Sequence, residues 1–164
     1  ELGCIPDIDF LCGTFGKALG SMGAFVVCSR TIRDFLINRM RPFIFSTALP
    51  PLNWSWTLFL LGKLPGMKDR REHLRTISGM LRGELEPYCP GMVSGTQIIP
   101  VVAGESEAAV RYAGKLQEAG FFVLPVRPPT VPEGSSRLRF SLTADMTEED
   151  IDALARAVHN IMQA

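Results

Sequence analysis

The sequence predicts an α/β fold, and three observations support this prediction. Short apolar runs rich in β-branched and aromatic residues alternate with segments of helical periodicity, most regularly beyond residue 96. Glycines and prolines separate these segments, as expected of the turns between strands and helices. The 164 residues are 46% hydrophobic and 21% charged, a composition typical of a globular protein that buries a core.

The first half of the chain is expected to contain short strands, a glycine-rich loop and two helices. The apolar runs that predict strands are residues 7–12, which we expect to be buried, 24–28 and 43–45. Glycines recur over residues 13–20, which therefore predict a loop. Ser29 can cap a helix over residues 30–40. The pair Pro50-Pro51 predicts the start of a helix that includes the apolar run 54–64, which either forms a core helix or packs against another part of the protein.

The second half is expected to form a small α/β lobe. Beyond Gly66 the helical spacing of Leu74, Ile77, Leu81 and Leu85 predicts a long amphipathic helix, followed by a loop over residues 87–95. The segments predicted next are a strand over 97–102, a helix over 106–119, a strand over 121–126, a proline-rich loop over 127–136 and a strand over 137–142. The last helix is predicted to begin at the capping pattern Thr147-Glu148-Glu149-Asp150.

Composition excludes several classes of function. Seventeen basic and seventeen acidic residues cancel, so neither nucleic acid nor an anionic membrane is an expected partner. The apolar run 54–64 is too short to span a bilayer. The cysteines lack metal-binding or disulfide-framework spacing, which favours a reduced, cytoplasmic location; they are Cys4, Cys12, Cys28 and Cys89. The sequence contains neither metal-ligand spacing nor a Ser-His-Asp set, so no metal site is predicted.

Lys17 is the first candidate for a functional residue, because it lies in a glycine-rich loop between two apolar runs. A lysine in such a loop can project its amine into a cleft, and its small neighbours leave room for donors around an anion. This chemistry suits an imine between Lys17 and an aldehyde cofactor whose phosphate binds Thr14. The alternative, a solvated lysine in a turn, stays open from the residues alone.

Hydroxyl side chains form a second candidate group. Ser46 and Thr47 follow a predicted strand and precede two prolines that stiffen the chain. Functional residues of α/β proteins gather at such strand ends. A simple turn is the alternative explanation for this pair.

Arginines form the third candidate group. Arg127 lies among prolines that restrict its loop, so a bound anion would cost less conformational entropy there. Arg137 and Arg139 are expected on one face of a strand, because side chains alternate between the two faces. The planar guanidinium fork suits a carboxylate ligand. The alternative is a solvated edge strand with two surface arginines.

Four stretches of sequence, in this order, resemble the signatures of the α-oxoamine synthase family. They are residues 14–20 (Thr-Phe-Gly-Lys-Ala-Leu-Gly), 43–51 (Phe-Ile-Phe-Ser-Thr-Ala-Leu-Pro-Pro), 127–134 (Arg-Pro-Pro-Thr-Val-Pro-Glu-Gly) and 136–143 (Ser-Arg-Leu-Arg-Phe-Ser-Leu-Thr). The resemblance covers almost the whole chain. It implies the fold type I aminotransferase scaffold and pyridoxal 5'-phosphate (PLP) as cofactor.

The resemblance also implies a role for each candidate residue. Lys17 matches the lysine that bonds to the PLP aldehyde, and Thr14 matches a ligand of its phosphate. Ser46 and Thr47 match the pair that reaches the phosphate of the neighbouring subunit's cofactor, which implies a homodimer with a shared active site.

Substrate-binding roles follow from the same resemblance. Arg139 matches the arginine that holds the amino-acid carboxylate, while Arg127 and Thr130 match the loop beside the acyl thioester. The Arg-Pro-Pro-Thr-Val-Pro run is most similar to the 8-amino-7-oxononanoate synthases of biotin biosynthesis, which condense L-alanine with a pimeloyl thioester and release carbon dioxide. Glycine C-acetyltransferase, another α-oxoamine synthase, or a non-catalytic fragment that only forms a dimer are the alternatives.

The resemblance further implies that the chain is the C-terminal part of a longer protein. Residues 1–50 would end the large PLP-binding domain, and residues 51–164 would form the small C-terminal domain with a long connecting helix. The family's aspartate, histidine and glycine-rich loop at the cofactor would lie upstream of Glu1, since Asp7 and Asp9 are too close to Lys17. The fragment alone is therefore expected to be inactive.

Overall fold

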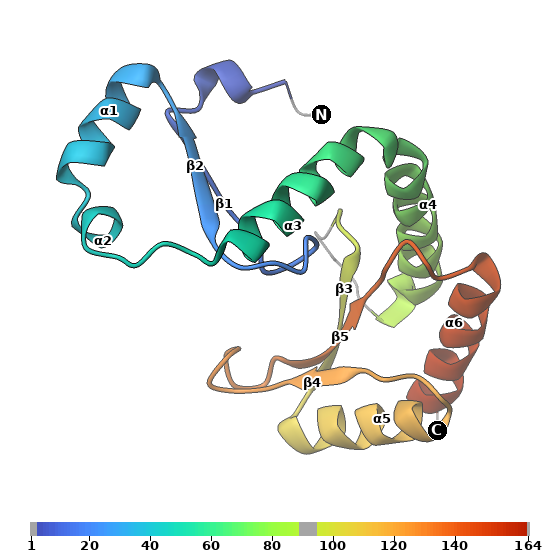
Figure 1. Cartoon of the computed structure of the whole chain (residues 1–164). Helices are drawn as coiled ribbons and strands as arrows, with labels where there is room; N and C mark the ends of the chain where they lie inside the picture. Colours follow the sequence, from blue (N-terminus) through green and yellow to red (C-terminus); the bar gives the residue numbers. More distant parts are fainter. Residues whose placement is uncertain (1–2, 89–94, 164) are drawn as a thin grey trace. The chain divides into compact units, whose positions relative to one another are not determined.

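The computed structural model describes residues 3–88 and 95–163 (Figure 1). The chain divides into two compact units, Glu1–Gly66 and Met67–Ala164. The assignment of residues 1–50 and 51–164 to a large and a small domain concerns a complete protein and stays a prediction.

The first unit begins with a two-stranded antiparallel sheet. After the 3-10 helix η1 (Ile5–Asp7), β1 (Phe10–Thr14) pairs with β2 (Ala24–Cys28), Phe10 opposite Cys28. The strand expected over 24–28 is confirmed. The strand expected at 7–12 starts later, because backbone bonds from Asp7 to Cys4 and from Ile8 to Ile5 close a turn there. Its predicted burial is wrong: among the described residues the sheet has two strands, and Phe10 is 53% exposed.

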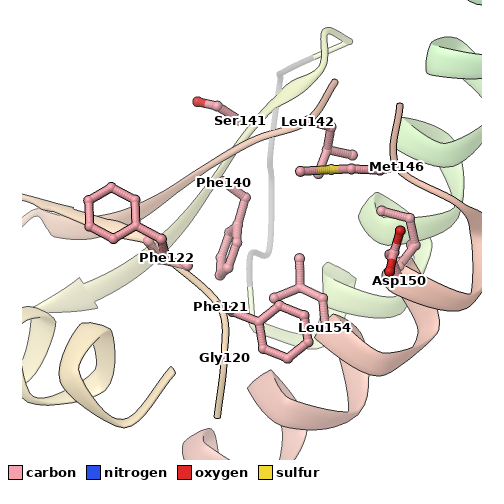
Figure 2. Close-up of a pocket in the computed structure, with 11 residues that line it drawn as sticks. Gly120, Phe121, Phe122, Phe140, Ser141, Leu142, Met146, Asp150 and Leu154 are labelled. Atoms are coloured by element: carbon pink, nitrogen blue, oxygen red, sulfur yellow. The ribbon is translucent and has the colours of Figure 1, made fainter. Parts of the chain in front are cut away.

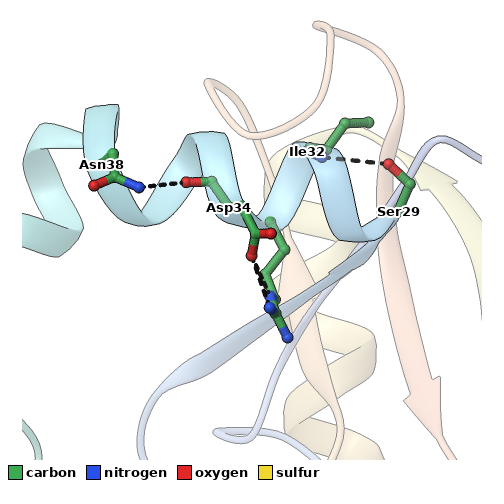
Figure 3. A network of polar contacts seen from close by, with 5 residues as sticks. Ser29, Ile32, Asp34 and Asn38 are labelled. Carbon is green, nitrogen blue, oxygen red and sulfur yellow. Dashed lines mark hydrogen bonds and ion pairs between the residues drawn. The ribbon is translucent and has the colours of Figure 1, made fainter.

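Helix α1 (Arg30–Arg39) confirms the helix expected over residues 30–40. Its first turn is capped as predicted, because the Ser29 hydroxyl accepts a hydrogen bond from the Ile32 N–H at 3.3 Å (Figure 3). Further along, the Asn38 side chain donates to the Asp34 carbonyl at 2.7 Å, and the Asp34 carboxylate pairs with Arg33 at the same distance.

The strand expected over residues 43–45 is wrong. Residues Arg41–Ile44 form the short helix α2 instead. Pro42 lies in its first turn, where a fixed φ favours a helix, and the Met40 carbonyl accepts from both Phe43 and Ile44 at 3.0 Å. Local backbone bonding therefore overrides the β-forming tendency of the apolar side chains.

Helix α3 (Pro51–Lys63) starts at the second proline of the predicted pair and is followed by the 3-10 helix η2 (Leu64–Gly66). Thr57 is the buried residue of α3, whereas Leu52 is 79% exposed and Leu58 is 72% exposed. Trp56 and Phe59 stack with ring centroids 5.8 Å apart.

The second unit contains a three-stranded antiparallel sheet in the order β3-β5-β4. Its strands are β3 (Ile98–Gly104), β4 (Leu124–Val126) and β5 (Ser136–Ser141). The predicted strands are thus confirmed with shifted ends. The segment 121–123 is not a strand, because Phe121 donates to the Leu116 carbonyl at 2.8 Å and Gly120 adopts a φ of +92°, so both residues close the preceding helix.

The core of this unit lies between one face of the sheet and three helices. These are α4 (Lys68–Leu85), α5 (Ser106–Glu118) and α6 (Glu148–Met162), which Figure 1 shows beside the strands. The predicted face of α4 is confirmed, because Ile77, Leu81 and Leu85 are fully buried. They pack in one cluster with Leu138 and Phe140 of β5.

The ends of α6 and α4 follow local signals. Thr147 caps α6 by accepting from the Asp150 N–H at 3.2 Å, and the Asp150 carboxylate accepts from the Thr147 N–H at 2.8 Å, as the capping pattern predicts. Helix α4 continues into the 3-10 helix η3 (Glu86–Tyr88). The rest of the loop expected over 87–95, Cys89 included, falls largely outside the described residues. Of the helices described, none is both long and apolar enough to cross a bilayer.

Candidate functional site

Lys17 lies at the tip of an ordered loop that connects β1 and β2. The Phe15 N–H donates to the Gly23 carbonyl at 3.0 Å, which extends the strand pairing, and the Ser21 N–H donates back to Phe15 at 2.9 Å. A turn in which Gly20 donates to the Lys17 carbonyl at 3.0 Å completes the loop. Because the backbone is bonded on both sides of Lys17, its exposed side chain projects from a fixed position.

Two contacts anchor this loop within the first unit. The Phe15 side chain is 5% exposed and its ring lies 5.4 Å from that of Phe25 on β2. The Ser21 hydroxyl lies 2.8 Å from the hydroxyl of Thr57, the buried residue of α3. Sequence reasoning missed both Ser21 and Thr57, since neither lies in a recognisable motif.

Leu49, which follows the Ser46–Thr47 pair, lies close to Gly23 at the end of the Lys17 loop. A Cβ atom added to Gly23 would lie 2.6 Å from the Cδ1 atom of Leu49 and 3.7 Å from the Phe15 ring. Gly23 also adopts a φ of +98°, so this contact requires glycine. The structure therefore places Leu49, two residues after Thr47, against the end of the loop that carries Lys17.

The donor groups of this unit suit an aldehyde that carries a phosphate. Thr14, Lys17, Ser46 and Thr47 are all exposed, and none of their side chains forms a hydrogen bond or ion pair within the described part of the chain. An amine can bond to an aldehyde carbon, and hydroxyl groups can donate to phosphate oxygens. The chemistry of these residues therefore fits PLP.

Arg137 and Arg139 lie on the open face of the second unit's sheet, as predicted. Arg139 is exposed and Arg137 half-buried, whereas Leu138 and Phe140 between and beyond them are buried on the other face. With Pro100 and Val126, the two arginines line an open depression of about 400 Å³, which Thr96 and Ile98 complete. The alternative of a solvated edge strand is wrong, because β5 is the central strand of the sheet.

The predicted substrate loop lies between β4 and β5. The Thr130 N–H donates to the Arg127 carbonyl at 3.0 Å, which forms a turn around the cis peptide bond between Pro128 and Pro129. Both Arg127 and Thr130 are exposed. The end of the loop is tied to β5, since the Arg137 Nε donates to the Ser135 carbonyl at 3.0 Å.

A second pocket of about 400 Å³ opens at the other side of this sheet (Figure 2). Its walls are mainly apolar and include Phe121, Phe140 and Leu154, with Met146 and Asp150 from the start of the α6 region. The Asp150 carboxylate is occupied in capping α6. No sequence motif indicated this pocket.

Across residues 3–88 and 95–163, His, Cys, Asp and Glu side chains form no group that could hold a metal ion.

The chain is also similar to known proteins. The chain matches the family model of aminotransferases of class I and II over residues 3–158. The 8-amino-7-oxononanoate synthase of Haemophilus ducreyi is 51% identical over 153 residues, covering 92% of this chain and 39% of that protein. A protein of Glaesserella parasuis that carries the same name provisionally is 55% identical over 152 residues, covering 92% of this chain and 40% of its own length.

Solved structures show the same fold. A serine palmitoyltransferase of Sphingomonas wittichii aligns with a TM-score of 0.89 at 31% identity, covering 99% of this chain and 42% of that one. An 8-amino-7-oxononanoate synthase of Francisella tularensis aligns with a TM-score of 0.80 at 27% identity, covering 94% and 45%. The predicted α/β, type I transferase fold is confirmed.

The chain spans about 40% of the length of the curated relatives it matches. The family match nevertheless extends over nearly all of its 164 residues. The chain therefore belongs to the aminotransferase class I and II family, and its resemblance to the α-oxoamine synthases within that family is confirmed.

Proposed function

We propose that this chain is part of a PLP-dependent acyltransferase that joins L-alanine to a pimeloyl thioester and releases carbon dioxide, forming 8-amino-7-oxononanoate. The observation that carries the proposal is the hydrogen-bonded loop 15–23, which presents the exposed Lys17 side chain three positions after the exposed Thr14. The name of the Haemophilus ducreyi relative supports the choice of reaction.

In this proposal the first unit holds the cofactor. Lys17 would attach the PLP aldehyde, and the Thr14 hydroxyl would donate to the PLP phosphate. Ser46 and Thr47 reach the phosphate bound by the neighbouring subunit of a homodimer. PLP, when bound, withdraws electrons from the Cα atom of the amino acid and so makes that carbon acidic.

The protein's own groups then guide the substrates. Arg139 binds the alanine carboxylate through its planar fork, because it has no competing partner in the described chain. The alanine amine would take the place of the Lys17 amine on the cofactor, and the freed Lys17 amine would then accept the Cα proton. The Cα electron pair attacks the thioester carbonyl carbon and the thiolate leaves. The carboxylate departs as carbon dioxide, and the electron pair left on Cα takes up a proton.

Arg127 and Thr130 would position the acyl group from their turn between β4 and β5. Their exposure leaves both side chains open to a ligand. A homodimer would also cover apolar side chains that the first unit exposes, such as Leu58 and Phe45, which is 75% exposed. A cytoplasmic location remains part of this proposal, because Cys4, Cys12 and Cys28 form no disulfide among the described residues.

A substrate matrix tests the reaction in the complete protein that carries this chain. L-alanine and glycine would each be paired with pimeloyl and acetyl thioesters, and product formation and carbon dioxide release measured. We expect the alanine–pimeloyl pair to give the highest kcat/KM. A preference for glycine with the acetyl thioester would instead assign the protein to glycine C-acetyltransferases.

The isolated chain provides a second test. Because the chain spans about 40% of the length of its curated relatives, we expect the 164-residue chain to bind PLP weakly and to be inactive. A complete protein that dimerises but neither binds PLP nor releases carbon dioxide would support a non-catalytic, dimer-forming role.

A further inference from the structure

Arg137 has one side of its guanidinium fixed and the other side open. Its Nε atom donates to the Ser135 carbonyl at 3.0 Å, while its terminal nitrogens have no partner among the described residues. Arg137 is half-buried, so less side-chain freedom remains to be lost on binding. A guanidinium held in this way presents two N–H groups that can grip a carboxylate.

The Ser135 bond also separates Arg137 from Arg139. Ser135 precedes Arg137 along the chain and Arg139 follows it, so the bond draws the Arg137 guanidinium away from Arg139. The Cα atoms of residues two positions apart on a strand are about 7 Å apart. The two arginines therefore mark two positions for anionic groups rather than one.

Apart from Thr96, the described residues around these two arginines are apolar. In the sheet, Arg139 lies opposite Pro100 of β3, and Arg137 lies opposite Val126 of β4. No acidic side chain is among the described residues that line the depression. This surface therefore suits two anionic groups with methylene groups between them.

We propose that Arg137 binds the carboxylate at the far end of the acyl chain and thereby makes the enzyme select a dicarboxylic acyl group. This inference rests on the proposed function, which assigns the amino-acid carboxylate to Arg139. An acyl chain of the same length that ends in a methyl group leaves Arg137 unpaired, so Arg137 does not strengthen its binding.

Binding of free acids tests this inference without catalysis. Calorimetry on the complete protein would compare pimelate with heptanoate, which has the same number of carbons and one carboxylate. We expect wild-type protein to bind pimelate roughly 10- to 100-fold more tightly, the effect of one charge-assisted hydrogen-bonded pair. Arg137→Gln should abolish this difference, and Arg137→Lys should retain part of it. Arg156→Gln, a change at an exposed arginine on α6, should leave it unchanged.

Kinetics with pimeloyl and heptanoyl thioesters distinguishes two roles of Arg137, binding the distal carboxylate and holding the loop in place. Arg137→Gln should raise KM for the pimeloyl thioester by the same factor while kcat/KM for the heptanoyl thioester stays within about twofold. An equal loss with both substrates would overturn the inference, because Arg137 would then only hold the 127–135 loop. Equal binding of pimelate and heptanoate by wild-type protein would also overturn it, even if Arg137→Gln fails to fold. An inactive wild-type protein that still prefers pimelate would refute the proposed reaction and not this inference.

Discussion

The Oγ atom of Ser21 lies 2.8 Å from the Oγ1 atom of Thr57. Ser21 closes the loop that carries Lys17, while Thr57 is the buried residue of α3. This hydrogen bond connects the candidate attachment site of the cofactor to a helix 36 residues further along the chain. The position of the Lys17 amine therefore depends on α3.

Thr57→Val should weaken cofactor binding, because valine keeps the shape of threonine and removes the hydroxyl. Losing one hydrogen bond costs about 1 kcal/mol, which corresponds to a roughly fivefold higher dissociation constant for PLP. Titration of the complete apoprotein with PLP measures this change. Thr31→Val, at an exposed position on α1, is the matched control. Equal affinities for both variants would show that Thr57 does not position the loop.

Gly23→Ala should destabilise the protein, because Gly23 combines a φ of +98° with a close approach to Leu49. An L-residue in such a conformation costs on the order of 1–2 kcal/mol before any steric clash is added. Thermal unfolding of the complete protein would report the loss. Gly62→Ala is the control, since its Cβ would meet nothing within 4 Å and alanine favours a helix. A Gly23→Ala protein as stable as wild type would contradict the loop geometry.

Much of the second unit could be predicted from the sequence, because helical spacing and burial agree there. The face of α4 and the cap of α6 arise from interactions within a few residues, so local patterns suffice. The first unit was harder to predict. The apolar runs that contain Phe10 and Phe43 both predict strands. Phe10 does pair with Cys28 in a sheet, but Pro42 favours a helix at Phe43.

Val158→Ala should destabilise the core of the second unit by about 2 kcal/mol, because it removes two methyl groups from a side chain that is 1% exposed. Urea denaturation followed by circular dichroism would give the change. Val110→Ala on α5 makes the same chemical change at a side chain that is 44% exposed, and should cost much less. Similar losses of stability in the two variants would show that Val158 does not belong to the core.

Thr147→Ala should cost about 1 kcal/mol, because it removes the acceptor that caps α6 and satisfies the Asp150 N–H. Thr143→Ala provides the comparison, as Thr143 is exposed and its hydroxyl makes no bond within the described chain. Denaturation midpoints of the two variants should differ. Identical midpoints would mean that the capping box contributes nothing to stability.

The candidate site was only partly predictable from the sequence. The motifs indicated Lys17, Thr14 and the arginines by their residue types. The contacts that position them involve other residues. The hydroxyls of Ser21 and Thr57 meet only in the folded chain, and the Ser135 carbonyl accepts from Arg137 only in the conformation that the loop adopts. Sequence patterns identify the reacting groups more readily than the residues that hold them in place.

The central claim is that the Lys17 amine is the attachment point of PLP. Borohydride treatment of the complete protein with bound PLP would fix the bond, and peptide mapping by mass spectrometry would locate it. We expect the pyridoxyl group on the peptide that contains Lys17, and no labelled peptide from the Lys17→Ala protein. Labelling of another lysine, such as Lys63 on α3, with Lys17 unmodified would contradict the account.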